Sequence, residues 1–294
     1  MAEEMVKYSK TKGIATITLN RPSKANTLRN ELLRALENAL KEANQDKEVK
    51  VIILQGAGDN FCGGFDFSGG LEHYEVIMED KYDPGMDAFW VTNQYTSYIP
   101  VFMGLWRGLK PTIAKVHGYC VGGGSEMALC ADLVIASDDA RIGTPYSRVW
   151  GCHLSGMWVY RLGLAKAKYY ALTGEWISGK EAAEIELINF SYPLEELDQK
   201  VQELAEKLTT IPLTQLISMK LIVNQAYDNM GLQGTQTLGP ILDGIMRNTP
   251  EGRDFVRVAA TKGVRGAIEM RDGPFGDYSQ GAPEDQPRKR SKLA

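Results

Sequence analysis

Apolar and polar positions follow two different periods along the first part of the chain. Residues 13–19, Gly-Ile-Ala-Thr-Ile-Thr-Leu, alternate with a period of two, which predicts a β-strand. Residues 27–43 place leucines at helical spacing with charged residues between them, which predicts an amphipathic helix. An apolar run at residues 51–54 predicts a second strand. Strand, helix and strand in this order predict βαβ units around a parallel sheet.

The central stretch, residues 111–136, is organised around three glycines. A predicted strand at residues 112–116 leads into a turn, the glycines 122–124, a predicted helix and a second strand at 133–136. Glycine accepts positive φ and lets another molecule approach the main chain. The first N–H groups of the helix lack carbonyl partners within it and stabilise negative charge. Glu126 behind them would be an acid beside an anion hole, suited to a carbonyl whose oxygen gains charge.

A Gly-Gly-Gly turn alone also fits a purely structural role, with Glu126 as a solvated carboxylate. A second glycine turn at residues 60–67, Asn-Phe-Cys-Gly-Gly-Phe-Asp-Phe, follows the predicted strand at 51–54 and changes that interpretation. Two such turns can supply two main-chain donors to one oxygen. The pair therefore indicates a site for an oxyanion.

Two segments resemble the signature segments of the crotonase (enoyl-CoA hydratase/isomerase) superfamily. They are Phe-Cys-Gly-Gly-Phe-Asp at 61–66 and His-Gly-Tyr-Cys-Val-Gly-Gly-Gly-Ser-Glu at 117–126. Residues 20–26, Asn-Arg-Pro-Ser-Lys-Ala-Asn, are similar to an early loop that contacts CoA in that family. The likeness extends from about residue 5 to residue 278. It implies an α/β fold, a repeated ββα spiral with a C-terminal helical lobe, rather than a Rossmann sheet, whose Gly-x-Gly-x-x-Gly motif is absent.

The same resemblance implies how the chain is divided. We expect a crotonase-like spiral core over residues 1–210, a helical oligomerisation lobe over 211–275, and a polar tail over 276–294 that is disordered. Helices are predicted at residues 198–209, 213–229, 236–247 and 251–270. The lobe is expected to pack on neighbouring subunits in a homotrimer or a homohexamer.

The resemblance also assigns catalytic roles. The main-chain N–H groups of Phe65 and Gly123 would form the oxyanion hole, and Glu126 stands where hydratases keep the first of two catalytic glutamates. The second glutamate would fall twenty residues later, where this chain has Tyr146. With an unperturbed pKa of about 10, tyrosine donates a proton or a hydrogen bond rather than acting as a carboxylate base. Either Glu126 and Tyr146 share the acid–base work, or Tyr146 is a pocket wall and Glu126 acts alone.

Further polar candidates lie in the loop after Tyr146, where hydratases carry a Pro-Gly-x-Gly-Gly segment that this chain lacks. Arg148, His153 and Ser155 occur there, and the pKa of an unperturbed histidine lies near 6.5. A lone histidine is more often packed or solvated than catalytic, so Arg148 and His153 are auxiliary candidates. By resemblance, the expected CoA-binding residues are Lys24, Ala25, Asn26, Gly64 and Asp66.

Residues 68–109 are rich in aromatic side chains. By resemblance, the segment after the first oxyanion turn covers the acyl pocket. A long aromatic cover favours a bulky or ring-bearing acyl group. The alternative is that these side chains only pack the segment onto the core.

Composition and charge narrow the function classes. The net charge of −4 argues against a general nucleic-acid binder. No apolar run approaches the ~20 residues of a membrane span, and no signal peptide opens the chain. The four cysteines lack paired metal-ligand spacing, so we expect no metal site and a cytoplasmic protein with reduced thiols.

The leading hypothesis is an enzyme that stabilises a thioester enolate, an enoyl-CoA hydratase or related lyase acting on a bulky or ring-bearing acyl-CoA. No cofactor is expected beyond the CoA of the substrate. A malonyl-type acyl-CoA decarboxylase, or a C–C hydrolase or isomerase of the same superfamily, is the alternative. A non-catalytic or RNA-binding member is a more remote one, because fold does not determine function.

Overall fold

Two β-sheets form the centre of the computed structural model, which describes residues 4–67, 83–93, 97–149 and 151–276. In these residues the main sheet has the strand order β1-β2-β3-β4-β6-β9, and the small sheet has the order β5-β7-β8. The strands are β1 (Val6–Thr11), β2 (Ile14–Leu19), β3 (Val51–Gly56), β4 (Thr112–Val116), β5 (Tyr119–Val121), β6 (Leu133–Ser137), β7 (Arg141–Gly143), β8 (Ile177–Ser178) and β9 (Phe190–Tyr192). Apart from the antiparallel β1–β2 hairpin, the strands of the main sheet are paired in parallel.

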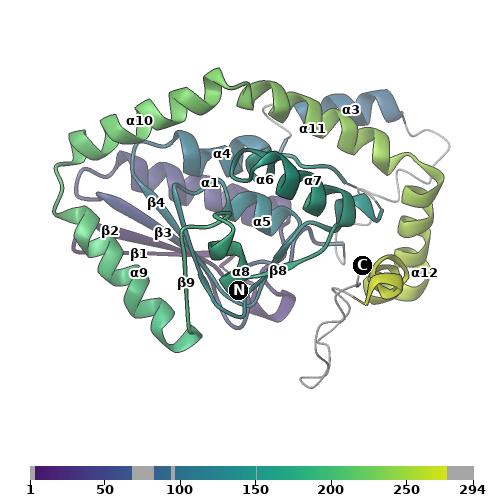
Figure 1. Ribbon diagram of the computed structural model, residues 1–294, viewed down its shortest axis with the longest axis horizontal. Helices are drawn as coiled ribbons and strands as arrows, with labels where there is room; N and C mark the ends of the chain where they lie inside the picture. Colours follow the sequence, from purple (N-terminus) through teal and green to yellow (C-terminus); the bar gives the residue numbers. More distant parts are fainter. Residues whose placement is uncertain (1–3, 68–82, 94–96, 150, 277–294) are drawn as a thin grey trace.

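The helices surround the main sheet and continue beyond it (Figure 1). They are α1 (Asn30–Gln45), α3 (Pro84–Thr92), α4 (Ile99–Arg107), α5 (Gly123–Ala128), α6 (Met157–Tyr160), α7 (Leu164–Thr173), α8 (Gly179–Glu184), α9 (Leu194–Thr209), α10 (Leu213–Asn229), α11 (Leu232–Arg247) and α12 (Pro250–Asp272). From β4 onward the chain moves between the sheets, since β4 of the main sheet is followed by β5 of the small sheet, then by α5 and by β6 of the main sheet. This is the repeated ββα arrangement that the sequence predicts.

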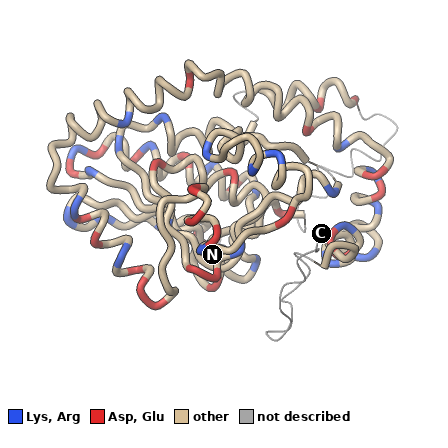
Figure 2. The backbone as a smooth tube through the Cα atoms, in the orientation of Figure 1, with Lys and Arg blue, Asp and Glu red and all other residues tan. Residues whose placement is uncertain are grey.

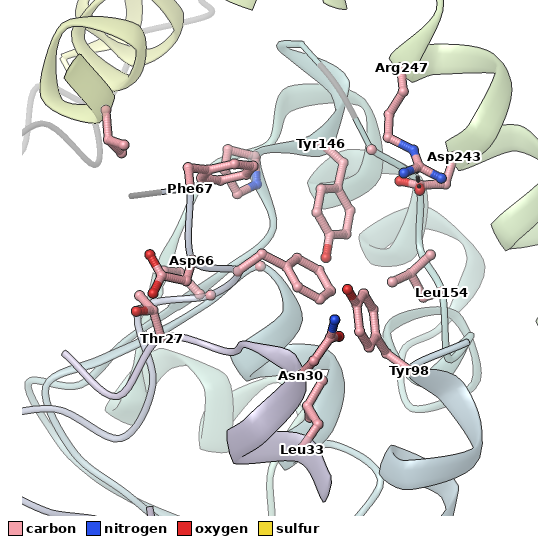
Figure 3. Close-up of a pocket in the computed structure, with 18 of the residues that line it drawn as sticks. Thr27, Asn30, Leu33, Asp66, Phe67, Tyr98, Tyr146, Leu154, Asp243 and Arg247 are labelled. Atoms are coloured by element: carbon pink, nitrogen blue, oxygen red, sulfur yellow. Dashed lines mark ion pairs between the residues drawn. The ribbon is translucent and has the colours of Figure 1, made fainter. Parts of the chain in front are cut away.

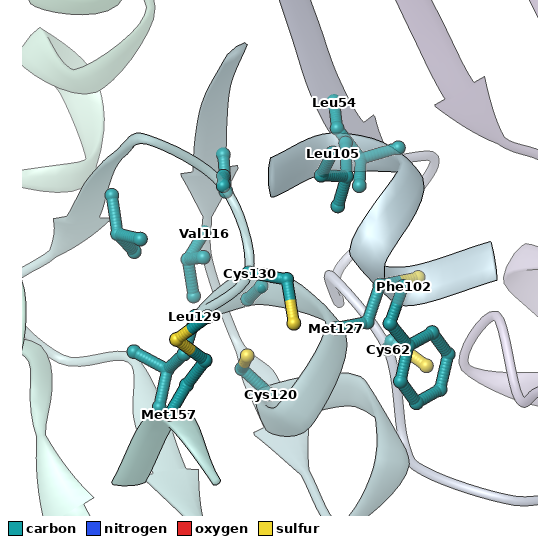
Figure 4. Close-up of a cluster of buried hydrophobic side chains, with 14 of the residues drawn as sticks. Leu54, Cys62, Phe102, Leu105, Val116, Cys120, Met127, Leu129, Cys130 and Met157 are labelled. Carbon is teal, nitrogen blue, oxygen red and sulfur yellow. The ribbon is translucent and has the colours of Figure 1, made fainter. Parts of the chain in front are cut away.

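Both faces of the main sheet are covered at β3, which explains why the first four residues of this strand are all apolar. In β3, Ile52 and Leu54 belong to the core that includes α1, whereas Val51 and Ile53 belong to the core formed with α9. Figure 4 shows Cys62, Cys120 and Cys130 within the first of these cores, among apolar side chains. Burial raises the pKa of Cys62 and Cys130 to about 12, so these thiols stay protonated and serve as packing groups.

The C-terminal helices are tied to the core by buried polar contacts. Lys220 of α10 donates hydrogen bonds to the carbonyl oxygens of Leu105 and Lys110 at 2.9 and 3.0 Å, and its Nζ lies 2.8 Å from Asp132 Oδ2. Beyond α10, the chain runs through α11, with α3 alongside, to α12 (Figure 1). The division at residue 210 stays a prediction, because these contacts join the two parts.

Most predicted elements occur within a few residues of the expected bounds. The predicted strand at 112–116 is β4, and the helix predicted from residue 27 begins at Asn30 as α1. The largest differences are at α9 and α11, which begin at Leu194 and Leu232 rather than at residues 198 and 236, and α11 continues through Pro240. Proline removes one helical hydrogen bond, but Gly239 and Pro240 are buried, with Gly239 against the carbonyl of His153.

Several expectations fall on parts of the chain outside the description. The predicted disordered tail from residue 277 onward lies outside the described residues, as does much of the aromatic segment 68–109. Within the part of the chain that the structure describes, no helix is both long and apolar enough to cross a membrane.

Candidate active site

The two glycine turns lie against each other. The N–H of Cys62 donates to the carbonyl of Tyr119 at 2.8 Å, and the N–H of Val121 donates to the carbonyl of Cys62 at 3.1 Å. Gly64 has a φ of 94°, and a Cβ added there would lie 3.0 Å from the Val121 carbonyl oxygen and 3.9 Å from the Cα of Gly122. The close approach and the positive φ both require glycine at position 64.

This junction brings together the two predicted oxyanion donors. Phe65 pairs with Leu28 in a short parallel bridge, in which Leu28 donates to Gly64 and Asp66 donates to Leu28. Successive N–H groups of an extended strand point in opposite directions, so the N–H of Phe65 points away from Leu28. Gly123 is the first residue of α5, and the ring of Phe65 lies 2.8 Å from the position of an added Cβ on Gly123. Within the described residues, neither N–H donates to a main-chain carbonyl.

Glu126 is completely buried and accepts three hydrogen bonds. Its Oε1 lies 2.9 Å from Nδ1 of His153, and its Oε2 accepts from the N–H of Ser155 at 2.9 Å and from the Ser155 hydroxyl. Because the carboxylate is an acceptor, Nδ1 is the protonated nitrogen of His153. The loop after Tyr146 therefore orients Glu126, and the structure joins three residues that the sequence places apart.

Tyr146 faces the main pocket, which has a volume of about 1090 Å³. Among the described residues its hydroxyl oxygen is buried without a hydrogen-bond partner, and it lies 3.9 Å from the position of a Cβ on Gly122. Burial raises the pKa of Tyr146 well above 10, and the negative charge of Glu126 adds to this effect. The hydroxyl is therefore protonated, as a hydrogen-bond donor beside the oxyanion turn. The pocket is lined by Tyr146 but, in the described part of the chain, not by Glu126 or His153.

The other end of the pocket is formed by α3, α11 and the residue before α4. Figure 3 shows Tyr98, Leu154, Asp243 and Arg247 on the side of the pocket opposite Asp66. Arg247 lies 3.2 Å from Asp243 and 3.2 Å from Asp87 of α3. Burial raises the pKa of Asp243 to about 6, which the charge of Arg247 opposes. Sequence analysis did not single out this cluster.

Comparison with known proteins identifies the family. The family model for enoyl-CoA hydratase/isomerase matches residues 9–239. The chain belongs to this family. A crystal structure of an enoyl-CoA hydratase from Mycobacterium smegmatis superposes with a TM-score of 0.86 at 38% identity, covering 93% of this chain and 94% of the other. The predicted superfamily and fold class are therefore confirmed.

Two relatives with named activities are similar to this chain. The hydroxycinnamoyl-CoA hydratase-lyase of Pseudomonas fluorescens is 31% identical over 207 residues, 69% of this chain and 72% of that protein. The 1,2-epoxyphenylacetyl-CoA isomerase of Escherichia coli strain K12 is 32% identical over 223 residues, 74% of this chain and 81% of that protein. These two relatives are about equally similar to this chain, but their names give different reactions, a hydratase-lyase and an isomerase. Similarity to them therefore does not identify the reaction of this chain.

In this enoyl-CoA hydratase/isomerase-family chain, four of the five predicted CoA-binding residues line the pocket: Lys24, Ala25, Gly64 and Asp66. Asn26 is fully buried, accepts from the N–H of Arg21 at 2.8 Å, and donates to the carbonyls of Ala57 and Asn60. Its side chain therefore holds the loop in shape and does not line the pocket among the described residues, and a contact of Asn26 with CoA stays a prediction.

Two further polar side chains hold the framework of the site. Asp66 forms a buried ion pair with Arg21, at 2.9 Å between Oδ2 and NH2. Arg148 donates to the carbonyl of Thr173 at 3.2 Å and pairs with Asp272 at 3.4 Å. Arg148 does not line the pocket in the described part of the chain, and its contacts fasten the end of α12, so its auxiliary role stays a prediction.

The structure also shows what the sequence could not reveal about this family member. The spacing of Asp243 and Arg247 by four residues on a predicted helix is a weak signal for a paired face. Nothing in the sequence indicates that Asp87 would meet them. Among the described residues no group of three or more His, Cys, Asp or Glu side chains could hold a metal ion.

Proposed function

We propose that this chain stabilises the enolate of an acyl-CoA thioester, as an enoyl-CoA hydratase or related lyase. The observation that supports the proposal is that the N–H groups of Phe65 and Gly123, on two turns that hydrogen-bond to each other, have no main-chain acceptors among the described residues. Each donor aimed at a developing oxyanion contributes about 3 kcal/mol to transition-state stabilisation. CoA enters as part of the substrate, and Lys24, Ala25 and Gly64 lie where it would bind.

In this proposal, two groups handle protons. Tyr146 is protonated and borders the pocket, so its hydroxyl donates to an oxygen of the substrate or of the attacking water. Glu126, oriented by His153 and Ser155, is the carboxylate that takes the proton of that water. The hydroxyl of the water adds to Cβ of the enoyl thioester, which gives the enolate, and the proton that Glu126 took from the water then goes to Cα.

One observation favours a second candidate, a malonyl-type decarboxylase or a C–C hydrolase. Glu126 already accepts three hydrogen bonds and is fully buried, whereas the unpartnered hydroxyl of Tyr146 lies at the pocket. Loss of carbon dioxide leaves an enolate that needs an oxyanion hole and a proton donor, but no strong base. Tyr146 fits that requirement.

The pocket wall supports a ring-bearing acyl group. Trp90, Tyr98 and Tyr146 line it together with aliphatic side chains. Two of the relatives carry cinnamoyl and phenylacetyl groups in the names of their activities. Aromatic side chains in the pocket wall stack favourably against the ring of an acyl group, which favours a ring-bearing substrate.

We propose further that the chain assembles as a trimer or a hexamer of two trimers. Helices α10 and α11 leave several large apolar side chains exposed, and an exposed apolar surface of this kind marks a site where subunits associate. They include Met219, Leu221, Ile222, Val223, Leu238 and Ile245. Light scattering at micromolar concentration that gives a monomer would contradict this assembly.

The remote alternative of an RNA-binding protein gains no support from the charge distribution. Figure 2 shows acidic and basic positions interspersed along the backbone of the described residues. A uniform basic stripe would be needed to follow a phosphate backbone.

The proposal is tested by incubating the protein with enoyl-, 3-hydroxyacyl- and malonyl-type CoA thioesters and identifying the products by mass spectrometry. A gain of water supports the hydratase, and a loss of carbon dioxide supports the decarboxylase. The matching free acids are the control, because they lack the CoA that the loop at Lys24 would bind. If no thioester is converted and calorimetry detects no binding, the proposed function is wrong, although the fold stands.

A further inference from the structure

The end of the pocket formed by α3, α11 and Tyr98 is where the acyl group would lie, and we call it the acyl end. It holds a charged cluster that the proposed chemistry does not use. Asp87, Asp243 and Arg247 all line the pocket, and their side chains are 9%, 18% and 7% exposed. The cluster therefore presents polar atoms to any group that occupies this end. Asp243 is the most exposed of the three, so it offers the most accessible acceptor oxygens.

The cluster is not the only contact that holds α3 against α11. Gly244 already packs on Ala88, with an added Cβ only 3.2 Å from the Ala88 Cα. Taking charged groups out of water is costly, and apolar residues of similar volume often replace a buried ion pair without loss of stability. A pocket meant only for hydrocarbon would be better walled by apolar side chains. The retained charges point to a polar group on the ligand.

We propose that this end binds an acyl group carrying a neutral hydroxyl at its far end, with the hydroxyl donating to Asp243; this rests on the proposed binding of CoA thioesters. One arginine faces two carboxylates, so the cluster has no spare positive charge for an acyl carboxylate. A hydroxyl instead offers the donor that a carboxylate accepts strongly. Tyr98 faces the same space, and burial raises its pKa, so its protonated hydroxyl can donate to the oxygen of the ligand.

Calorimetry with matched saturated acyl-CoA thioesters tests this selectivity separately from catalysis, because these ligands have no double bond to hydrate. The set carries hydrogen, hydroxyl, carboxylate or trimethylammonium at the far end, on a straight chain and on a phenyl ring. The hydroxyl form should bind about 10-fold or more tightly than the hydrogen form in at least one scaffold. The carboxylate form should bind more weakly than the hydrogen form.

Two isosteric variants separate recognition from helix packing. Asp243→Asn should reduce the preference for hydroxyl to below about 3-fold while the hydrogen form keeps its affinity. Asp87→Asn removes the same charge and another partner of Arg247, and it should change both affinities alike. Equal binding of hydroxyl and hydrogen forms, tightest binding of the carboxylate or trimethylammonium form, or an equal effect of Asp243→Asn on both ligands overturns the inference. Failure of every CoA thioester to bind overturns the proposed function with it.

Discussion

The two ends of the pocket are built in different ways. At the end that we propose for the oxyanion, the proposed donors are the main-chain N–H groups of Phe65 and Gly123, on turns joined by backbone hydrogen bonds at Cys62. At the acyl end, they are side chains of Tyr98, Asp243 and Arg247, held by the packing of helices far apart in the sequence. A site made of main-chain N–H groups keeps its donors when the surrounding side chains are substituted. A site made of side chains gains or loses its donors and acceptors with each substitution. The first end therefore suits chemistry shared by a family, and the second suits selectivity.

The largest expected effect is at Glu126, behind the oxyanion end. Glu126→Gln keeps the volume but removes the carboxylate that would take a proton from water. If the chain is a hydratase, turnover should fall by about 10² to 10⁴, while affinity for the thioester changes little. Steady-state kinetics combined with calorimetry measures both quantities.

Two further measurements keep that result interpretable. The melting temperature shows whether the loss of a buried acceptor for His153 and Ser155 has unfolded the site. Tyr146→Phe should also lower turnover if its hydroxyl handles a proton, and should leave it unchanged if the ring is only a wall. Unchanged turnover in Glu126→Gln, on a substrate that the wild type converts, would favour the decarboxylase.

A second prediction concerns the frame of the oxyanion end. Asp66 and Arg21 form an ion pair whose side chains are only 5% and 8% exposed. Asp66→Asn leaves the guanidinium buried without its counter-charge, which should lower the free energy of unfolding by about 3–5 kcal/mol. Denaturant titration measures this.

An exposed ion pair provides the matched control for Asp66. Glu48 lies 2.6 Å from Lys10, and its side chain is 78% exposed. Glu48→Gln should change the free energy of unfolding by less than about 1 kcal/mol. Equal effects at Asp66 and Glu48 would show that the Arg21 pair does not hold the turn.

The two ends also differ in how far the sequence predicts them. The oxyanion end is made of short contiguous segments, so apolar strands and glycine turns, together with the family resemblance, indicated Phe65, Gly123 and Glu126. The structure brings the first two together and places Glu126 on the helix that Gly123 begins. The sequence could not show that Ser155 and His153 would close around Glu126, because that contact depends on how a loop folds back.

At the acyl end, the sequence did not predict the cluster of Asp87, Asp243 and Arg247, and the reason is physical. Asp87 and Arg247 are 160 residues apart and meet only because α3 packs along α11. Propensity and periodicity describe the neighbourhood of each residue, not such distant pairs. The sequence likewise could not show that the side chain of Asn26 turns inward and hydrogen-bonds to the carbonyls of Ala57 and Asn60.

A third prediction tests how Tyr146 is held between the two ends. Gly151 has a φ of 134°, and an added Cβ would lie 2.4 Å from Cδ1 of Tyr146. Gly151→Ala should therefore displace the ring and lower the free energy of unfolding by about 1–3 kcal/mol. Gly163→Ala is the control, because Gly163 has a φ of −70° and an added Cβ meets no atom within 4 Å. Thermal unfolding and turnover of both variants would be compared, and equal behaviour would mean that the Tyr146 loop adapts freely.

The smallest expected effect is at the acyl end, in the dependence of stability on pH. Burial raises the pKa of Asp243 to about 6 in the folded chain, against about 4 when unfolded. The folded state therefore holds this proton more tightly, so the contribution of Asp243 to stability is fully present below about pH 4 and is lost as pH rises through about 6. Between pH 5 and pH 7 the loss amounts to about 1 kcal/mol. Asp243→Asn removes the titration, so denaturant titrations at the two pH values should show a smaller loss for the variant than for the wild type. The charge pair with Arg247 forms only where Asp243 is ionised, so its effect is already included in the raised pKa of Asp243 and belongs to the titration that the variant removes. Equal losses in the two proteins would mean that Asp243 stays ionised and hydrated, with the acyl end open to water rather than closed around its charges.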